Sequence, residues 1–187
     1  MSTAFDAPHD ELDGPYWSGT RLALTVVVIL IVAMWAWIYL FAPRSNPDRL
    51  ADPDFADRAE SICAPFHAEV LEIPPGNTAT TPELRARQVE TGTEITREMV
   101  AALQSAAASV VDPDDIRILD AWFEDWQAYL IDREAHAVKL DSAEPGTPSR
   151  DLAFTLTERA SGGIYTRRID GLANVNDMES CQVPRDV

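Results

Sequence analysis

The histidines and their acidic neighbours are the first residues to consider for chemistry. The sequence holds three histidines, His9, His67 and His136. Zinc enzymes of the H-E-x-x-H type need two histidines one helical turn apart, and this chain has no such pair. Asp132 and His136 are four positions apart, which on a helix permits a local ion pair. We interpret them as a surface salt bridge.

Paired acidic residues could hold a metal, but their spacing does not favour it. Glu94 and Glu98 are four positions apart, as in bundles that bind two irons, yet those bundles also need Glu-x-x-His motifs, which this chain lacks. Aspartate clusters at 52–57 and 112–115 lack the glycine and final glutamate of a calcium loop and fit helix caps. Nucleophile-elbow and phosphate-binding glycine patterns are also missing. The sequence therefore predicts no metal, no cofactor, no catalytic residue and no enzymatic activity.

The two cysteines, Cys63 and Cys181, lie near opposite ends of the region that follows the apolar stretch at residues 22–41. No C-x-x-C motif is present, which argues against a redox-active or zinc site. An isolated pair in a cytosolic domain is usually two free thiols, whereas an extracytoplasmic domain favours a disulfide. We predict a Cys63–Cys181 disulfide.

An aromatic set forms the third feature that could carry function. Trp122, Trp126 and Tyr129 share one side of an expected helix. They could fill the core, or they could anchor a partner as a candidate partner surface. Arg133 falls in the same arc, so it either snorkels outward or pairs with an acid.

The elements that position these residues are predicted to be helices. Pro82 follows Thr81, and Pro113 follows Asp112, which is the pattern of an N-cap with proline at the first helical position. The first helix is expected to kink or restart at Pro65. Apolar spacing predicts helices from Asp54 to the break at 74–77, over 81–109 with its first two turns mostly exposed, over 112–140, and over 163–175. Residues 152–157 alternate weakly and could be a short extended piece, and the class is an all-α bundle of three to four helices.

One stretch is far more apolar than the rest. Leu22 to Phe41 contains no charge, glycine or proline and spans about 30 Å as a helix, the thickness of a bilayer's hydrocarbon core. The Phe41-Ala42-Pro43-Arg44 sequence offers no small-residue cleavage site. We expect one uncleaved transmembrane helix over residues 21–42, flanked by a disordered acidic cytoplasmic tail (1–20), a linker (43–53) and a helical extracytoplasmic domain (54–187).

Charge and compartment narrow the classes of partner. The formal net charge of −16 disfavours nucleic acid and docking onto anionic lipid. The positive-inside count favours a cytoplasmic domain, because Arg44, Arg49 and Arg58 follow the span. Long domains translocate largely regardless of charge, and the cysteine pair favours the outside. We expect the tail inside and the domain outside the plasma membrane.

The layout of the chain resembles that of small, uncharacterised single-span or lipoprotein-like cell-envelope proteins of high-GC Gram-positive bacteria. The shared features are a short acidic tail, one span, a helix with an early Cys63, acidic helices rich in Ala and Leu, and a late Cys181. The resemblance implies an envelope location and no known activity. Unlike the lipoproteins, this chain has no cysteine directly after the apolar stretch to take a lipid.

These observations predict a non-catalytic, single-pass interaction protein or accessory subunit of an envelope complex, which binds another envelope or membrane protein. The alternative is an extracytoplasmic ligand-binding or sensor module. A tail of about 20 residues is too short for a signalling domain, so such a module would act through a partner subunit. An envelope enzyme is the third class, and the sequence shows no catalytic set for it.

Overall fold

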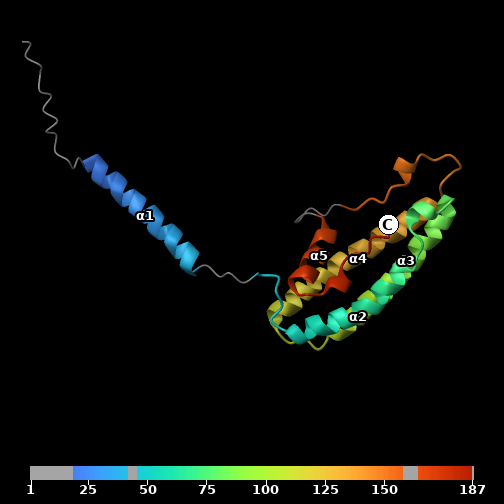
Figure 1. Cartoon of the computed structure of the whole chain (residues 1–187), viewed down its shortest axis with the longest axis horizontal. Helices are drawn as coiled ribbons and strands as arrows, with labels where there is room; N and C mark the ends of the chain where they lie inside the picture. Colours follow the sequence, from blue (N-terminus) through green and yellow to red (C-terminus); the bar gives the residue numbers. More distant parts are fainter. Residues whose placement is uncertain (1–18, 42–45, 158–163, 187) are drawn as a thin grey trace, which may run out of the picture. The chain divides into compact units, whose positions relative to one another are not determined.

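The computed structural model describes residues 19–41, 46–157 and 164–186 of the 187-residue chain (Figure 1). Every regular element in these ranges is helical, which confirms the all-α class. The chain divides into two compact units, Met1–Ser45 and Asn46–Val187. The predicted tail lies outside the described residues up to position 18, and Gly19 and Thr20 already belong to the first helix.

The first unit contains one described helix, α1 (Gly19–Phe41). None of its side chains is buried, and its mean hydropathy reaches 2.6 over an 18-residue window. By length and composition α1 could cross a membrane, and a signal sequence near the N-terminus has the same properties. Together with the disulfide of the second unit, α1 indicates a secreted or membrane-anchored protein.

The second unit is built on three long helices, α2 (Pro53–Leu71), α3 (Pro82–Ala107) and α4 (Pro113–Asp141). Each begins with a proline, and each is capped by the preceding side chain. The caps are Asp52, whose oxygen accepts from Asp54 N and Phe55 N, Thr81, which accepts from Leu84 N, and Asp112, which accepts from Asp114 N and Asp115 N. The starts predicted at Thr81 and Asp112 are confirmed, and α2 begins at Pro53, one residue before the predicted Asp54.

The α2 helix continues through Pro65 as a single element, so of the expected kink or restart the restart does not occur. Pro65 has no N–H to donate to the carbonyl of Ser61 four residues before it. Because Pro65 lies on the exposed side of α2, that carbonyl can bond water instead.

The core lies where α3 packs on both α2 and α4, and where α5 (Tyr165–Val175) packs on the other side of α4 (Figure 1). Trp122, Trp126 and Tyr129 are 2%, 0% and 0% exposed, and the Trp126 ring meets the other two edge-on with centroids about 6 Å apart. The structure thus assigns these residues to the core, and the candidate partner surface drawn from them is not on the surface. Ile116, in the first turn of the same helix, is 41% exposed.

The C-terminal part of the domain is tied back to α2 by a covalent bond. Cys63 of α2 and Cys181 of the short helix η3 (Glu179–Cys181) form the predicted disulfide, with their Cα atoms 5.2 Å apart. Beside it, Glu60 accepts hydrogen bonds from the backbone N–H and the hydroxyl of Ser180, at 2.9 and 2.6 Å. This confirms the disulfide and places the C-terminal tail on α2.

Two further predictions concern short segments. The helix η1 (Gly76–Thr78) follows the Pro74–Pro75 break, and η2 (Ser149–Leu152) precedes the proposed extended piece. Residues 153–157 have no regular secondary structure, but Phe154 and Leu156 are half-buried while the other three residues are exposed. The expected start of the last helix at 163 falls outside the described residues, and α5 begins at Tyr165.

The predicted linker is part of the folded domain wherever it is described. Asp115, 2% exposed, accepts hydrogen bonds from the backbone N–H groups of Ala51 and Asp52, both at 2.9 Å. The Asn176 side chain accepts from Leu50 N at 2.8 Å and donates to Asp48 O at 2.9 Å. The compact unit consequently begins at Asn46 rather than at residue 54.

Candidate functional site

The Asp132–His136 pair does not form, so the surface salt bridge was wrongly predicted. Asp132, 6% exposed, accepts from the backbone N–H and the hydroxyl of Thr157, both at 2.6 Å, and from the Tyr165 hydroxyl. His136 is also buried, and its ring meets Phe154 edge-on at 5.2 Å. Both side chains contact the segment that follows η2 rather than each other, Asp132 at Thr157 and His136 at Phe154.

His136 is held in its neutral form by its surroundings. Burial lowers its pKa to about 4, and the positive charges of Lys139, Arg85 and Arg133 act in the same direction. Its Nδ1 atom is buried and makes no hydrogen bond among the described residues. Within those residues, no group of three or more His, Cys, Asp or Glu side chains is arranged to hold a metal.

The Arg133 guanidinium forms the centre of a buried polar cluster, which we call the clamp and define as Arg133, Asp186, Thr93, Tyr129 and Val89. Arg133 is 0% exposed and donates from both terminal nitrogens to the two carboxylate oxygens of Asp186, each at 2.6 Å. It also donates to Thr93 Oγ1 and the Tyr129 hydroxyl at 2.9 Å and to Val89 O at 3.3 Å. Of the two expectations for Arg133, pairing with an acid is the one the structure shows.

Gly92 leaves the space that the clamp occupies, because it has no side chain. A Cβ at this position would lie 2.5 Å from Asp186 Oδ2, 2.6 Å from Arg133 Nη2 and 3.2 Å from Ile73 Cδ1. The glycine that weakens α3 locally is therefore where the C-terminal segment approaches the helix backbone. Arg85 lies next to it, donates to Asp186 O and to Gln88 Oε1, and packs against Gly76.

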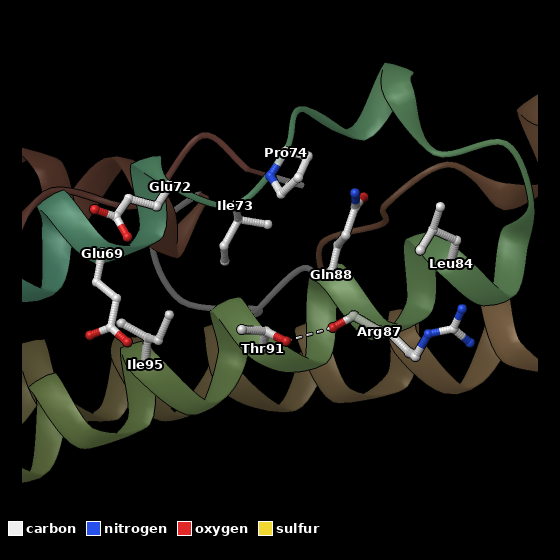
Figure 2. Close-up of a pocket in the computed structure, with 9 residues that line it drawn as sticks. All are labelled: Glu69, Glu72, Ile73, Pro74, Leu84, Arg87, Gln88, Thr91 and Ile95. Atoms are coloured by element: carbon white, nitrogen blue, oxygen red, sulfur yellow. Dashed lines mark hydrogen bonds between the residues drawn. The ribbon is translucent and has the colours of Figure 1, made fainter.

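Next to the clamp the domain surface opens into a groove between the C-terminal end of α2 and the first half of α3 (Figure 2). This end of α2 lies about 28 Å along the helix from its start at Pro53. The groove has a volume of about 380 Å³. Its lining residues are Glu69, Glu72, Ile73, Pro74, Leu84, Arg87, Gln88, Thr91 and Ile95.

The floor of the groove is apolar. Ile95 is 7% exposed, and Ile73 and Leu84 are half-buried. In Figure 2 the Ile73 side chain points from the α2 side toward α3. Thr91 donates its hydroxyl to Arg87 O within α3 at 2.9 Å, so this hydroxyl proton is already used by the helix.

The rim of the groove carries three exposed charges, Glu69, Glu72 and Arg87. Among the described residues, their side chains make no ion pair or hydrogen bond with the rest of the protein. Glu69 lies in the last turn of α2 and Glu72 is its C-cap, and that turn has no basic residue. Partial negative charge collects at a helix C-terminus, so two carboxylates there are disfavoured by the helix itself.

The clamp and the groove share a wall. Ile73 and Pro74 line the groove on one side, and on the other they line a second pocket of about 210 Å³ together with Pro184 and Asp186. The Ile73 side chain rests on α3 at Gly92, beside the ion pair. The clamp thereby holds in place the loop that forms this wall of the groove.

Sequence reasoning missed the groove and the role of Asp186. One signal was available, because acidic residues without a basic neighbour at the end of a helix run against the helix dipole. The pairing of Arg133 with Asp186, 53 positions away, has no local signal. Comparisons of the chain with models of protein families, with curated proteins and with solved structures found no match.

Proposed function

We propose that the protein is a non-catalytic, single-pass interaction protein or accessory subunit of an envelope complex, with its helical domain outside the plasma membrane. In this proposal α1 remains as the span, since 23 residues at about 1.5 Å per residue suffice to cross a bilayer. The Cys63–Cys181 disulfide supports an oxidising compartment for the domain.

The observation that carries the proposal is the contrast between the buried charges and the groove. Asp115, Asp132 and Arg133 are each bound to other parts of the fold. Asp125 likewise holds Arg168 of α5, with Oδ2 and Nε 2.7 Å apart. These groups serve to position the chain, whereas the groove leaves apolar and charged side chains open to a partner. Binding therefore fits the domain better than catalysis.

A ligand-binding or sensor module acting through a partner subunit is the second candidate. A volume of about 380 Å³ lies within the range of small-molecule sites. The groove is, however, wide open along α3 rather than enclosing, which suits a segment of another protein better.

The topology can be tested through Lys139, the only lysine in the chain. A membrane-impermeant amine reagent applied to intact spheroplasts should label this residue, as located by mass spectrometry, and the K139R variant should lose the label. Labelling of Lys139 that requires permeabilisation would place the domain inside and contradict the proposal.

The interaction itself can be tested with a photo-crosslinking amino acid at Thr91 in the groove. The matched control carries it at Gln127, which is exposed on α4. In intact membranes Thr91 should give one discrete protein adduct that Gln127 does not give. Identical adduct patterns, or none from Thr91, would contradict an interaction through the groove.

A further inference from the structure

We infer that the groove binds an extended partner segment whose central side chain is apolar and whose α2-facing neighbour is a lysine or arginine. This inference rests on the proposed function and adds the chemistry of the partner. It is drawn from the charges of the rim, the apolar floor and the length of the groove.

The charges favour a cation at the α2 end. Glu69, Glu72 and the C-terminal carbonyls of α2 gather negative charge in one place, and α2 has no basic residue in its last turn. The α4 helix, in contrast, has Lys139 in its last turn. A lysine or arginine from a partner would neutralise the site that the domain leaves open.

The opposite end of the groove carries the opposite charge. In Figure 2, Glu69 and Glu72 lie toward one end and Arg87 toward the other, with Ile73 between them. A bound segment is therefore oriented, with its basic residue near α2 and an acidic or polar residue near Arg87.

The floor and the length define the rest of the partner. Ile73, Leu84 and Ile95 offer apolar surface to one side chain of about leucine size. From Leu84 to Ile95 the α3 helix rises about 16 Å, which an extended segment of roughly five residues covers. The contact is thus the size of a short linear motif.

The overall acidity of the protein would attract any basic peptide, so the test needs a control pair of acids. Asp120 and Glu124 are exposed on α4, four positions apart, and have no ion pair among the described residues. D120N/E124Q removes the same number of charges as E69Q/E72Q, away from the groove.

The experiment uses the full chain in phosphatidylcholine nanodiscs and three fluorescent peptides. The peptides share a central leucine and differ in one residue next to it, which is lysine, serine or glutamate; the residue on the other side of the leucine is serine in all three. Wild type should bind the lysine peptide about fivefold more tightly than the serine peptide, and the glutamate peptide most weakly. E69Q/E72Q should remove the lysine preference, and D120N/E124Q should keep it within twofold.

The apolar floor has its own pair of variants. L84S should weaken the lysine peptide about fivefold, because it removes exposed apolar surface from the groove. I131S, which changes an exposed isoleucine on α4, should leave the affinity unchanged. Equal effects of the two serine variants would overturn the assignment of the apolar side chain to the groove.

The outcomes separate this inference from the proposed function. If E69Q/E72Q keeps the lysine preference, or if D120N/E124Q loses it equally, the inference is overturned. If the Thr91 adduct then persists in E69Q/E72Q at wild-type yield, the interaction protein stands and only the partner chemistry is wrong. If Thr91 gives no adduct in membranes while the peptide preference follows Glu69 and Glu72, the groove chemistry stands and the proposed function fails.

Discussion

The charged side chains of the clamp are largely buried and paired, whereas those of the groove rim are exposed and unpaired among the described residues. The two regions nevertheless lie on two sides of the same wall at Ile73. In the clamp, Arg133 is 0% exposed, and every N–H group of its guanidinium donates a hydrogen bond to an acceptor. On the rim, Glu69 and Glu72 are exposed, lack partners among the described residues and lie at the wrong end of a helix dipole.

This difference shows which charges the fold itself requires. A buried guanidinium without partners would be strongly destabilising, so the clamp is explained by folding alone. Exposed carboxylates at a helix C-terminus give the domain no stability, and folding does not explain them. Residues that slightly destabilise a domain are often found at its functional sites, and Glu69 and Glu72 lie on an open groove. Their position is therefore typical of a binding site.

The largest expected effect comes from opening the clamp. R133M leaves the carboxylate of Asp186 buried without its partner, and we expect a loss of about 3–5 kcal/mol in the free energy of unfolding. The matched control is R97M, since Arg97 pairs with Glu94 and Glu134 while about 43% exposed, and its loss should stay below about 1 kcal/mol. Urea denaturation measures both, and similar losses would remove the distinction between buried and exposed pairs.

The next effect is the pH dependence caused by His136 beside the clamp. Its pKa is lowered to about 4 in the folded protein, so below the ordinary value of 6.5 the unfolded chain takes up a proton that the folded chain does not. The free energy of unfolding should therefore fall as pH decreases from 6.5 to 4, by up to about 3 kcal/mol, and this contribution should be constant below 4.

H136F isolates this contribution, because it removes the titrating group and keeps an aromatic ring against Phe154. Denaturation of wild type and H136F at a series of pH values gives the difference between their stabilities. A difference that does not vary between pH 7 and 4 would mean that His136 titrates alike in both states.

A smaller effect is expected at the wall between the two regions. G92A places a methyl group against Asp186 and Arg133, whose ends are fixed by their own bonds, and should cost about 1–2 kcal/mol net. G171A in α5 meets nothing within 4 Å and should instead stabilise the domain by about 0.5–1 kcal/mol. Thermal denaturation compares the stabilities of the two variants. Stabilisation by both substitutions would show that the clamp residues can move to accommodate the added methyl group.

The smallest effect belongs to the rim. E69Q/E72Q removes two negative charges from the end of α2 and should raise the free energy of unfolding by about 0.3–1 kcal/mol at low salt. High salt should erase the gain. A loss of stability in this double variant would mean that the two carboxylates support the fold. Their position on the rim would then be no evidence for a binding site.

Much of the fold could be predicted because its signals are local. Asp52, Thr81 and Asp112 each precede a proline, and a cap needs only its own first turn. Apolar spacing indicated the helices, and two cysteines at the ends of one domain left a single intramolecular pairing. The helix did not restart at Pro65, the second of the two alternatives there, because an exposed proline can remain in a helix that packing holds together.

The sequence by itself determined the apolar span-like helix, the helix starts and the disulfide, since these depend on composition and near neighbours. The tertiary structure alone decided which face each side chain met. Trp126 belongs to the core rather than to a surface, Asp132 binds Thr157 rather than His136, and Arg133 receives an aspartate from the far end of the chain. Apart from the unpaired acids at the end of α2, the groove also had no sequence signal, because its floor and rim come from segments that are brought together only when α2 packs on α3.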